Sequence, residues 1–154
     1  MISLEEIGQF VYREARLADE GEYDAWEALW TDDAVYSVPA GGNDPERQMS
    51  IIHDNRSRIA LRVKQLKTGK RHAQCPPSSV RRVVSNVEVL GHAGDDVLVG
   101  ANFVAVESRP RGTVLWAGRT EYRLRCDGGT LRLAQKTVTL VDRERPLPTL
   151  AFLV

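Results

Sequence analysis

The sequence contains few of the residues that mark several large protein classes. Its two cysteines, Cys75 and Cys126, lie far apart, without a CxxC pattern or a neighbouring histidine pair. They indicate neither a disulfide framework nor a zinc site, and they suit a reducing cytoplasm. The 21 basic residues equal the 21 acidic residues, so the formal net charge is zero. A chain without excess positive charge is not expected to bind nucleic acid.

Long apolar runs are also absent. No window approaches the roughly 18 apolar residues that cross a bilayer, and "MISLEEIGQF" lacks the basic and apolar regions of a secretion signal. We therefore expect a cytoplasmic protein with no membrane partner. The 154 residues suffice for one continuous core, whereas two halves would be too small to fold alone. The expectation is a single domain over residues 1–154.

The N-terminal part of the chain has helical patterns. Ser3 followed by Glu6 forms a capping box, which satisfies backbone N–H groups at the start of a helix. Apolar residues then recur at helical spacing up to Gly21, a residue that ends helices. Apolar side chains between Tyr23 and Trp30 predict a short second helix.

The next segment should turn and then form short strands. Asp32 and Asp33 have turn chemistry, and residues 34–38 predict a short strand. Residues 51–52 predict another brief strand. Asp54 is a suitable N-cap for a third helix that ends before a glycine.

From residue 80 onward, the apolar pattern has the period of two that is typical of strands. Four strands separated by the turns "GHAGD", "RPRG" and "DGG" are predicted at 80–90, 97–108, 114–126 and 130–142. In the third strand, Trp116 and Tyr122 face one side, while Arg119 and Arg123 face the other. Helices followed by a strongly curved antiparallel sheet give an α+β fold, with the helices on the concave side.

Few residues stand out as catalytic candidates. Tyr23, Asp33 and His72 can take part in proton transfer if the fold encloses a pocket, although a turn role is the preferred interpretation of Asp32 and Asp33. The histidines lack the i, i+3 or i, i+4 spacing of a helical metal pair; they are His53, His72 and His92.

Two other features predict contacts with partner chains. Basic residues cluster around "LKTGKRH" and "VRR", and they are Lys67, Lys70, Arg71, His72, Arg81 and Arg82. This patch is either an ordinary solvated loop or a surface that docks an acidic patch of another subunit. The C-terminal segment "PLPTLAFLV" contains Phe152 and Leu153 and must be covered to stay ordered, because ordering each residue costs about 1–2 kcal/mol. Its own sheet or a partner can provide that cover.

The order of several segments resembles one family. The segments are "EARLADEGEYDAWEALWTDDAVYSVP", "HDNRSRIALRVKQLKTGKRHAQCPPSSVRRVVSNVEV", "GRTEYRLR" and "LRLAQKTVTLVD". Together they are similar to the small (beta) subunit of Rieske-type aromatic-ring-hydroxylating dioxygenases. The resemblance covers nearly the whole chain.

The resemblance implies the cone-shaped α+β fold of nuclear transport factor 2 and its relatives, which is called NTF2-like or cystatin-like. It also implies a homotrimer that carries three large (alpha) subunits in an α3β3 assembly. The large subunit holds the Rieske 2Fe-2S cluster and a mononuclear iron. This chain has no CxH…CxxH motif, so we expect it to bind no cofactor or metal and to contain no catalytic residues.

One residue departs from the pattern of the family. Arg82 stands in "RRVVSN" where relatives commonly read "RHLVSN". A guanidinium stays charged and cannot replace imidazole as an acid or base, so we interpret this strand as structural and interfacial. Two alternatives stay open: a stand-alone SnoaL-like isomerase or dehydratase that uses Tyr23, Asp33 or His72, and a module that binds aromatic acids through Arg82.

Overall fold

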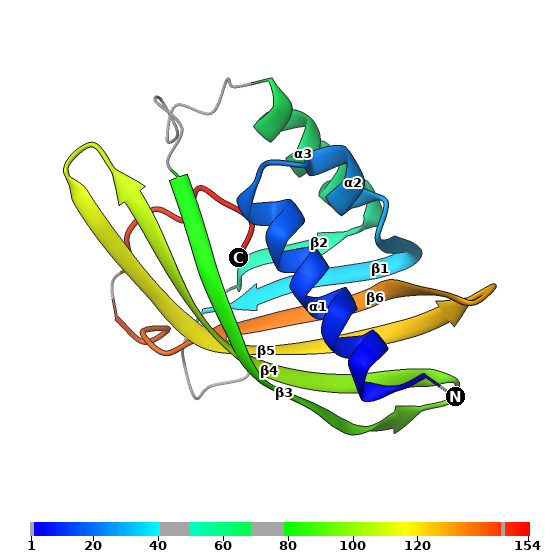
Figure 1. Ribbon diagram of the computed structural model, residues 1–154. Helices are drawn as coiled ribbons and strands as arrows, with labels where there is room; N and C mark the ends of the chain where they lie inside the picture. The colour runs from blue at the N-terminus through cyan, green and yellow to red at the C-terminus, as the bar shows by residue number, and fades with distance from the viewer. Residues whose placement is uncertain (1, 41–49, 69–78, 146) are drawn as a thin grey trace.

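A computed structural model describes residues 2–40, 50–68, 79–145 and 147–154 of the chain. Three helices and six strands follow one another in the order α1 (Leu4–Asp19), α2 (Tyr23–Glu27), β1 (Trp30–Pro39), β2 (Ser50–Asn55), α3 (Arg56–Lys67), β3 (Ser79–Ala93), β4 (Asp96–Arg109), β5 (Gly112–Asp127) and β6 (Thr130–Leu140). Figure 1 shows the sheet curving around α1. Helices α2 and α3 pack on each other, and α3 lies against β1 and β2. This is the predicted α+β architecture.

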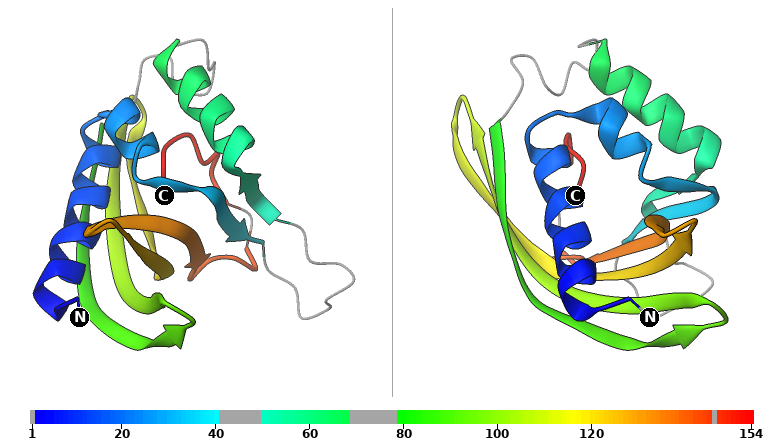
Figure 2. Two further views of the ribbon diagram at one scale, coloured as in Figure 1. Left: turned by 90° about the vertical axis from the view of Figure 1, so that its right-hand side faces the viewer. Right: turned by 45° about the vertical axis from the view of Figure 1, so that its right-hand side comes forward.

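The six strands form one sheet in the order β2-β1-β6-β5-β4-β3. The predicted meander is confirmed, since β3 to β6 pair in sequence as antiparallel neighbours. Strand β1 extends it by pairing parallel to β6, and β2 adds an antiparallel edge. The two views of Figure 2 show that α1 and the C-terminus lie inside the resulting curve.

Helix α1 begins as its sequence predicts. The side chain of Ser3 accepts a hydrogen bond from the backbone of Glu6, whose carboxylate accepts one from the backbone of Ser3 in return. The inward face of the helix is buried, and Gly21 adopts a φ of 70° just after the helix ends. The positive φ explains why glycine stands at this position.

Three details between residues 30 and 55 differ from the predictions. Trp30 belongs to β1 and not to the second helix. Asp32 and Asp33 do not form a turn before the strand, because they lie within β1 where its register against β6 shifts. Asn55, not Asp54, caps α3, while Asp54 pairs with Arg62 of that helix at 2.6 Å.

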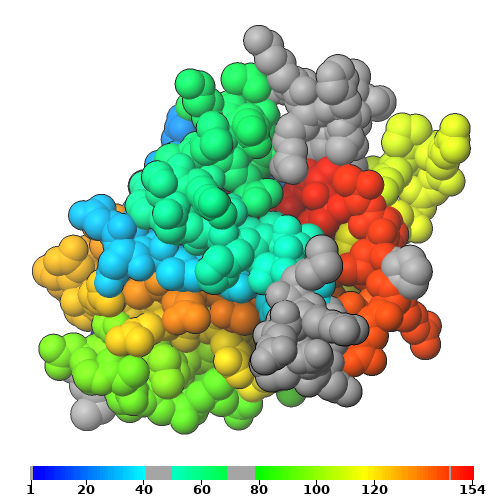
Figure 3. Space-filling view, turned by 180° about the vertical axis from the view of Figure 1, so that it is seen from behind, coloured from blue at the N-terminus to red at the C-terminus, as the bar shows by residue number. Residues whose placement is uncertain are grey.

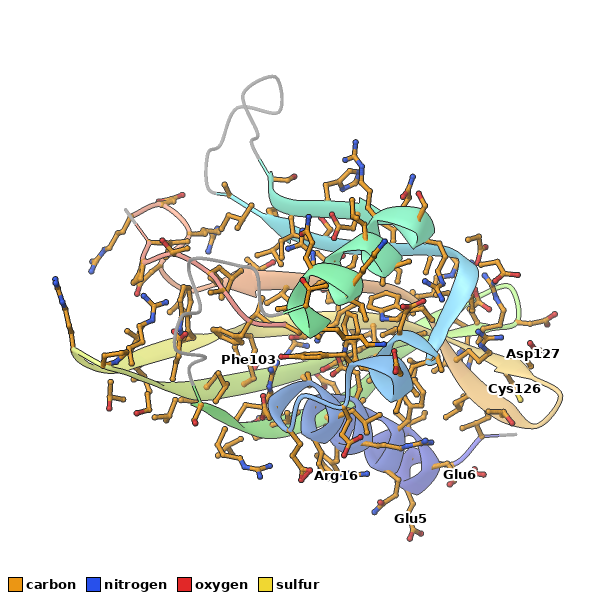
Figure 4. The ribbon with its side chains drawn as sticks, turned by 90° about the horizontal axis from the view of Figure 1, so that it is seen from above. Glu5, Glu6, Arg16, Phe103, Cys126 and Asp127 are labelled. Atoms are coloured by element: carbon orange, nitrogen blue, oxygen red, sulfur yellow. The ribbon has the colours of Figure 1, made fainter. Side chains whose placement is uncertain are left out.

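Two local features allow the sheet to bend over its core. Asn86 has a φ of 56° where the register of β3 shifts against β4, which makes a bulge that increases strand twist. Gly118 lies where β5 meets β6 closely, and a Cβ there would overlap the carbonyl oxygen of Thr139. Figure 4 shows Phe103 among the side chains between the sheet and the helices, whereas Glu5, Glu6 and Arg16 extend from α1 away from the sheet and Cys126 and Asp127 lie at the β5–β6 turn.

The crowding at Gly118 predicts a large effect of a small side chain. Gly118→Ala should lower the free energy of unfolding by about 1–3 kcal/mol, because the added methyl group forces two backbones apart. Gly8→Ala is the matched control, since its Cβ makes only an ordinary contact with Tyr12 and the change favours the helix by up to about 1 kcal/mol. Urea denaturation measures both; equal stability of the two variants would contradict the close approach.

Candidate functional site

A charged pair lies at the centre of the molecule, between α1 and β6. The Nζ atom of Lys136 is 2.5 Å from Oε1 of Glu14, and the exposed fractions of the two side chains are 2% and 1%. The Nε1–H of Trp26 donates a second hydrogen bond to the same carboxylate oxygen at 3.1 Å. The pair therefore joins α1 to both the sheet and α2.

Aromatic rings enclose this pair. Lys136 Nζ lies 5.8 Å from the ring centroid of Tyr36 and 6.0 Å from that of Tyr122, distances at which a cation is attracted to a ring face. Burial lowers the pKa of Lys136, although the Glu14 carboxylate opposes that shift. Burial also raises the pKa of both tyrosines, so their hydroxyl groups stay protonated.

Sequence reasoning missed this pair, although a signal was present. Glu14 occupies the same helical face as Ile7 and Val11, and Lys136 alternates with Ala134 and Val138 on the inward side of β6. A charge at an inward position of both elements predicts that the two charges meet, because an unpaired buried charge is very costly.

A second buried pair joins α1 to β3. Asp19 accepts hydrogen bonds from Nε, Nη2 and the backbone N–H of Arg82, at 2.8, 2.7 and 2.9 Å. The exposed fractions are 4% for the arginine side chain and 3% for the aspartate. Arg82 also donates to the backbone oxygen atoms of Leu153 and Val154 at 2.5 and 3.3 Å. Its guanidinium is therefore occupied within its own chain.

The structure brings together none of the predicted catalytic candidates that it describes. Tyr23 lines an open groove between the end of α1 and β3, and burial raises its pKa. Asp33 accepts hydrogen bonds from Arg125 and Thr31, which lower its pKa to about 2 and keep it ionised near neutral pH. His72 lies outside the described residues.

The predicted interface residues fall into different environments. Lys67 pairs with Asp24 at 2.7 Å, and Arg81 lies 3.7 Å from Glu20, so neighbouring acidic groups reduce the local positive charge. Lys70 and Arg71 lie outside the described residues, as His72 does. The C-terminal pair Phe152 and Leu153 is buried against the chain's own core, where the Phe152 ring packs edge-to-face on Trp116 at 5.6 Å.

Several exposed apolar side chains lie together on the convex side of the sheet. They come from β3, β4, β5 and the residue that follows β6, and we call this surface the outer face; its members are Val83, Val104, Val106, Leu115 and Val141. Val83 pairs with Val104, and Val106 pairs with Leu115, so these residues lie in neighbouring cross-strand rows. Val83 is 70% exposed and Leu115 is 64% exposed. A contiguous apolar surface of this kind is typical of a protein contact site.

Neither a metal-binding cluster nor a membrane-spanning helix is found among the described residues. Within residues 2–40, 50–68, 79–145 and 147–154, no group of three or more His, Cys, Asp or Glu side chains is placed to hold a metal ion. None of the helices described is long and apolar enough to span a membrane.

The curved sheet with helices inside it defines an NTF2-like, cystatin-like fold. An NTF2-like protein with a cystatin-like fold from Novosphingobium aromaticivorans superposes with a TM-score of 0.62 at 18% identity, covering 90% of this chain and 81% of that one. The beta subunit of the benzoate 1,2-dioxygenase from Burkholderia mallei superposes more closely. Its TM-score is 0.80 at 29% identity, with coverage of 92% of this chain and 93% of that one.

Sequence comparison resolves the family within this fold. A family model described as "Ring hydroxylating beta subunit" matches residues 13–144. The small oxygenase component of the p-cumate 2,3-dioxygenase system of Pseudomonas putida is 32% identical over 141 residues, which cover 88% of this chain and 77% of that protein. The chain belongs to the ring hydroxylating beta subunit family, and it is a small subunit of an aromatic-ring-hydroxylating dioxygenase. The resemblance noted from the sequence is confirmed.

The buried Glu14–Lys136 pair makes a stability prediction. Lys136→Met should lower the free energy of unfolding by about 3–5 kcal/mol, because it leaves the Glu14 carboxylate buried without its cation. The double variant Glu14→Gln/Lys136→Met should recover most of this loss, since the amide still accepts the hydrogen bond from Trp26. Urea denaturation measures each variant.

The exposed pair Lys67–Asp24 provides the control. Lys67→Met should change the free energy of unfolding by less than about 1 kcal/mol, because both charges stay hydrated in either protein. A double variant as unstable as Lys136→Met alone would contradict the assignment of the loss to an unpaired charge.

Proposed function

We propose that this chain is the non-catalytic scaffold of its dioxygenase, and that it acts by assembling and holding large subunits. Its membership of the ring hydroxylating beta subunit family is the observation that carries this proposal. The large subunit would contain the Rieske cluster and the iron at which the aromatic ring is hydroxylated. A cytoplasmic location fits both this role and the two thiols of the chain.

The sealed centre of the molecule supports a structural role. An enzyme that acts by proton transfer would need an acid–base pair that its substrate can reach. Glu14 and Lys136 form such a pair, but both are buried beneath aromatic side chains. The stand-alone isomerase or dehydratase is therefore not favoured. A module that binds aromatic acids through Arg82 is not favoured either, because Asp19 and the C-terminal backbone oxygen atoms already occupy that guanidinium.

The assembly we propose is a trimer of this chain that carries three large subunits, with the outer face as the contact between copies. Two observations support a second copy as the occupant of this face. Arg119 beside it is paired with Glu88 of the same chain at 3.0 Å, so this arginine adds little repulsion between copies. The chain as a whole carries no formal net charge. Lys67 and Arg81, with Lys70, Arg71 and His72, remain candidates for the contact with the large subunit.

Co-purification tests the proposed function. This chain should be retained when it is co-expressed with the large subunit of the same enzyme and only the large subunit carries an affinity tag. The retained complex should hydroxylate an aromatic substrate when its electron donors are supplied, and the small subunit alone should not. A chain that stays unbound, or that converts an aromatic compound without a partner, would contradict the proposal.

Substitutions on the outer face test the contact between copies. Val83→Glu and Leu115→Glu should each weaken self-association at least tenfold, because a carboxylate would lose water at an apolar contact. Leu61→Glu is the matched control, since Leu61 is 55% exposed on α3, outside the outer face. Light scattering over a range of protein concentrations gives the native mass. A wild-type monomer at every concentration, or glutamate variants that assemble normally, would rule out this contact.

A further inference from the structure

The last eight residues form a strap across the concave side of the sheet. Residues 147–154 have no helix or strand structure, yet the side chains of Ala151 to Val154 are buried. Seen from behind in Figure 3, this red segment lies between α3 and the β4–β5 hairpin. Among the described residues, no backbone–backbone hydrogen bond holds the strap. Its order therefore depends on side chains that contact it.

Two arginines hold the strap, one near each end. Arg82 of β3 donates to the backbone oxygen atoms of Leu153 and Val154 while Asp19 orients its guanidinium. Arg109 at the end of β4 donates to the carbonyl oxygen of Thr149. A carboxylate thus fixes the first arginine in place, and the second one has an equivalent support.

Glu107 provides the support for the second arginine. Its Oε1 atom accepts hydrogen bonds from Nε of Arg109 at 2.8 Å and from Nε1 of Trp116 at 3.1 Å. The Trp116 ring in turn packs on the ring of Phe152 between the two arginine contacts, and Arg82 lies 5.9 Å above the Phe152 ring. The strap is therefore coupled to three adjacent strands: β3, β4 and β5.

Two of the residues that contact the strap, Arg82 and Trp116, lie in one row of the sheet. Arg82 pairs with Ala105, and Ala105 pairs with Trp116, so the three lie side by side and face inward. Successive residues of a strand face opposite sides. The rows on either side of this one therefore point outward.

Those neighbouring rows contain most of the outer face. One row runs through Val83 and Val104, and the other runs through Val106 and Leu115. The strap row thus lies between two rows of the exposed apolar surface, one residue away from each. The strap therefore contacts Arg82 and Trp116 on the inner side of the same strands that present this surface on their outer side.

We propose that the strap is a latch that fixes the shape of the outer face from the inside and so controls self-association without contacting a partner. This inference rests on the proposed function, in which the outer face joins copies of the chain. The latch has two separable parts. Arg82 keeps the strap docked, and the docked strap keeps β3 to β5 in the geometry that can assemble.

Arg82→Lys tests the latch in the full-length chain. Lysine keeps the positive charge but has no planar fork, so it cannot hold Asp19 and two backbone oxygen atoms together. We expect amide hydrogen exchange of residues 150–154 to become at least tenfold faster. Arg81→Lys is the matched control, because Arg81 is the adjacent residue and its side chain is 70% exposed; its exchange should equal that of the wild type. Circular dichroism checks that each variant folds.

A second variant keeps the test decisive if Arg82→Lys does not fold. Arg109→Gln removes the other contact at a position whose side chain is 27% exposed, so we expect a smaller but measurable increase in exchange at residues 147–151. Unchanged exchange in the folded variants would overturn the latch.

The native mass of the same variants tests the coupling to assembly. Arg82→Lys should weaken self-association at least fivefold, while Leu61→Glu, which lies on α3 outside the outer face, should not. Faster exchange with normal assembly would overturn the coupling and leave the proposed function intact. Val83→Glu should weaken assembly while the exchange of residues 150–154 stays at the wild-type rate. If Val83→Glu assembles normally, the outer face itself is wrong, whatever the strap does.

Discussion

The whole arrangement depends on two acidic side chains on the inward face of α1. Glu14 pairs with Lys136 of β6, and Asp19 pairs with Arg82 of β3. These strands are separated in the sheet by β5 and β4, so the helix is fixed to both sides of the curve. Buried ion pairs add little net stability, because desolvation offsets their attraction, but a misplaced partner leaves a charge unpaired. The pairs therefore specify where α1 lies more than they strengthen the fold.

Fixing α1 in this way determines what the concave side can do. Within the described residues, the buried rings of Trp26, Trp30 and Tyr36 pack together, with centroids 5.3 to 5.9 Å apart. Lys136 of β6 lies over the Tyr36 ring, and the strap contacts Arg82. The exposed side chains of the outer face therefore remain available for contact with another protein.

Local sequence patterns predicted most of the helices and strands. The errors lie where contacts with other elements decide the structure. The capping box at Ser3 and the turn glycines depend on neighbouring residues, so their sequence signals are direct. Aspartates are common in turns, so the sequence predicts a turn at Asp32 and Asp33. In the structure they lie inside β1, where the register of β1 against β6 shifts. Asp54 has the chemistry of a helix cap, but its carboxylate pairs with Arg62 eight residues later, and the capping pattern does not contain that contact.

The site was harder to predict because its parts come from distant segments. Glu14 and Lys136 are 122 residues apart, and Arg82 meets Leu153 across 71 residues. The apolar terminus signalled correctly that it needed cover, but hydrophobicity carries no information about which chain supplies it. In the structure, side chains of β3, β4 and β5 of the same chain contact this terminus.

The sequence nonetheless contains a second signal for a partner, and it lies in β4. Residues 97–106, "VLVGANFVAV", are apolar almost without interruption. Strands that are covered on both faces have such continuous runs, whereas strands with one wet face alternate. Within this chain, inward residues such as Val99 and Phe103 are covered, whereas the outward Val104 and Val106 stay exposed. The outward side of β4 is therefore apolar but uncovered at Val104 and Val106. This mismatch is the physical reason to place another protein on the outer face.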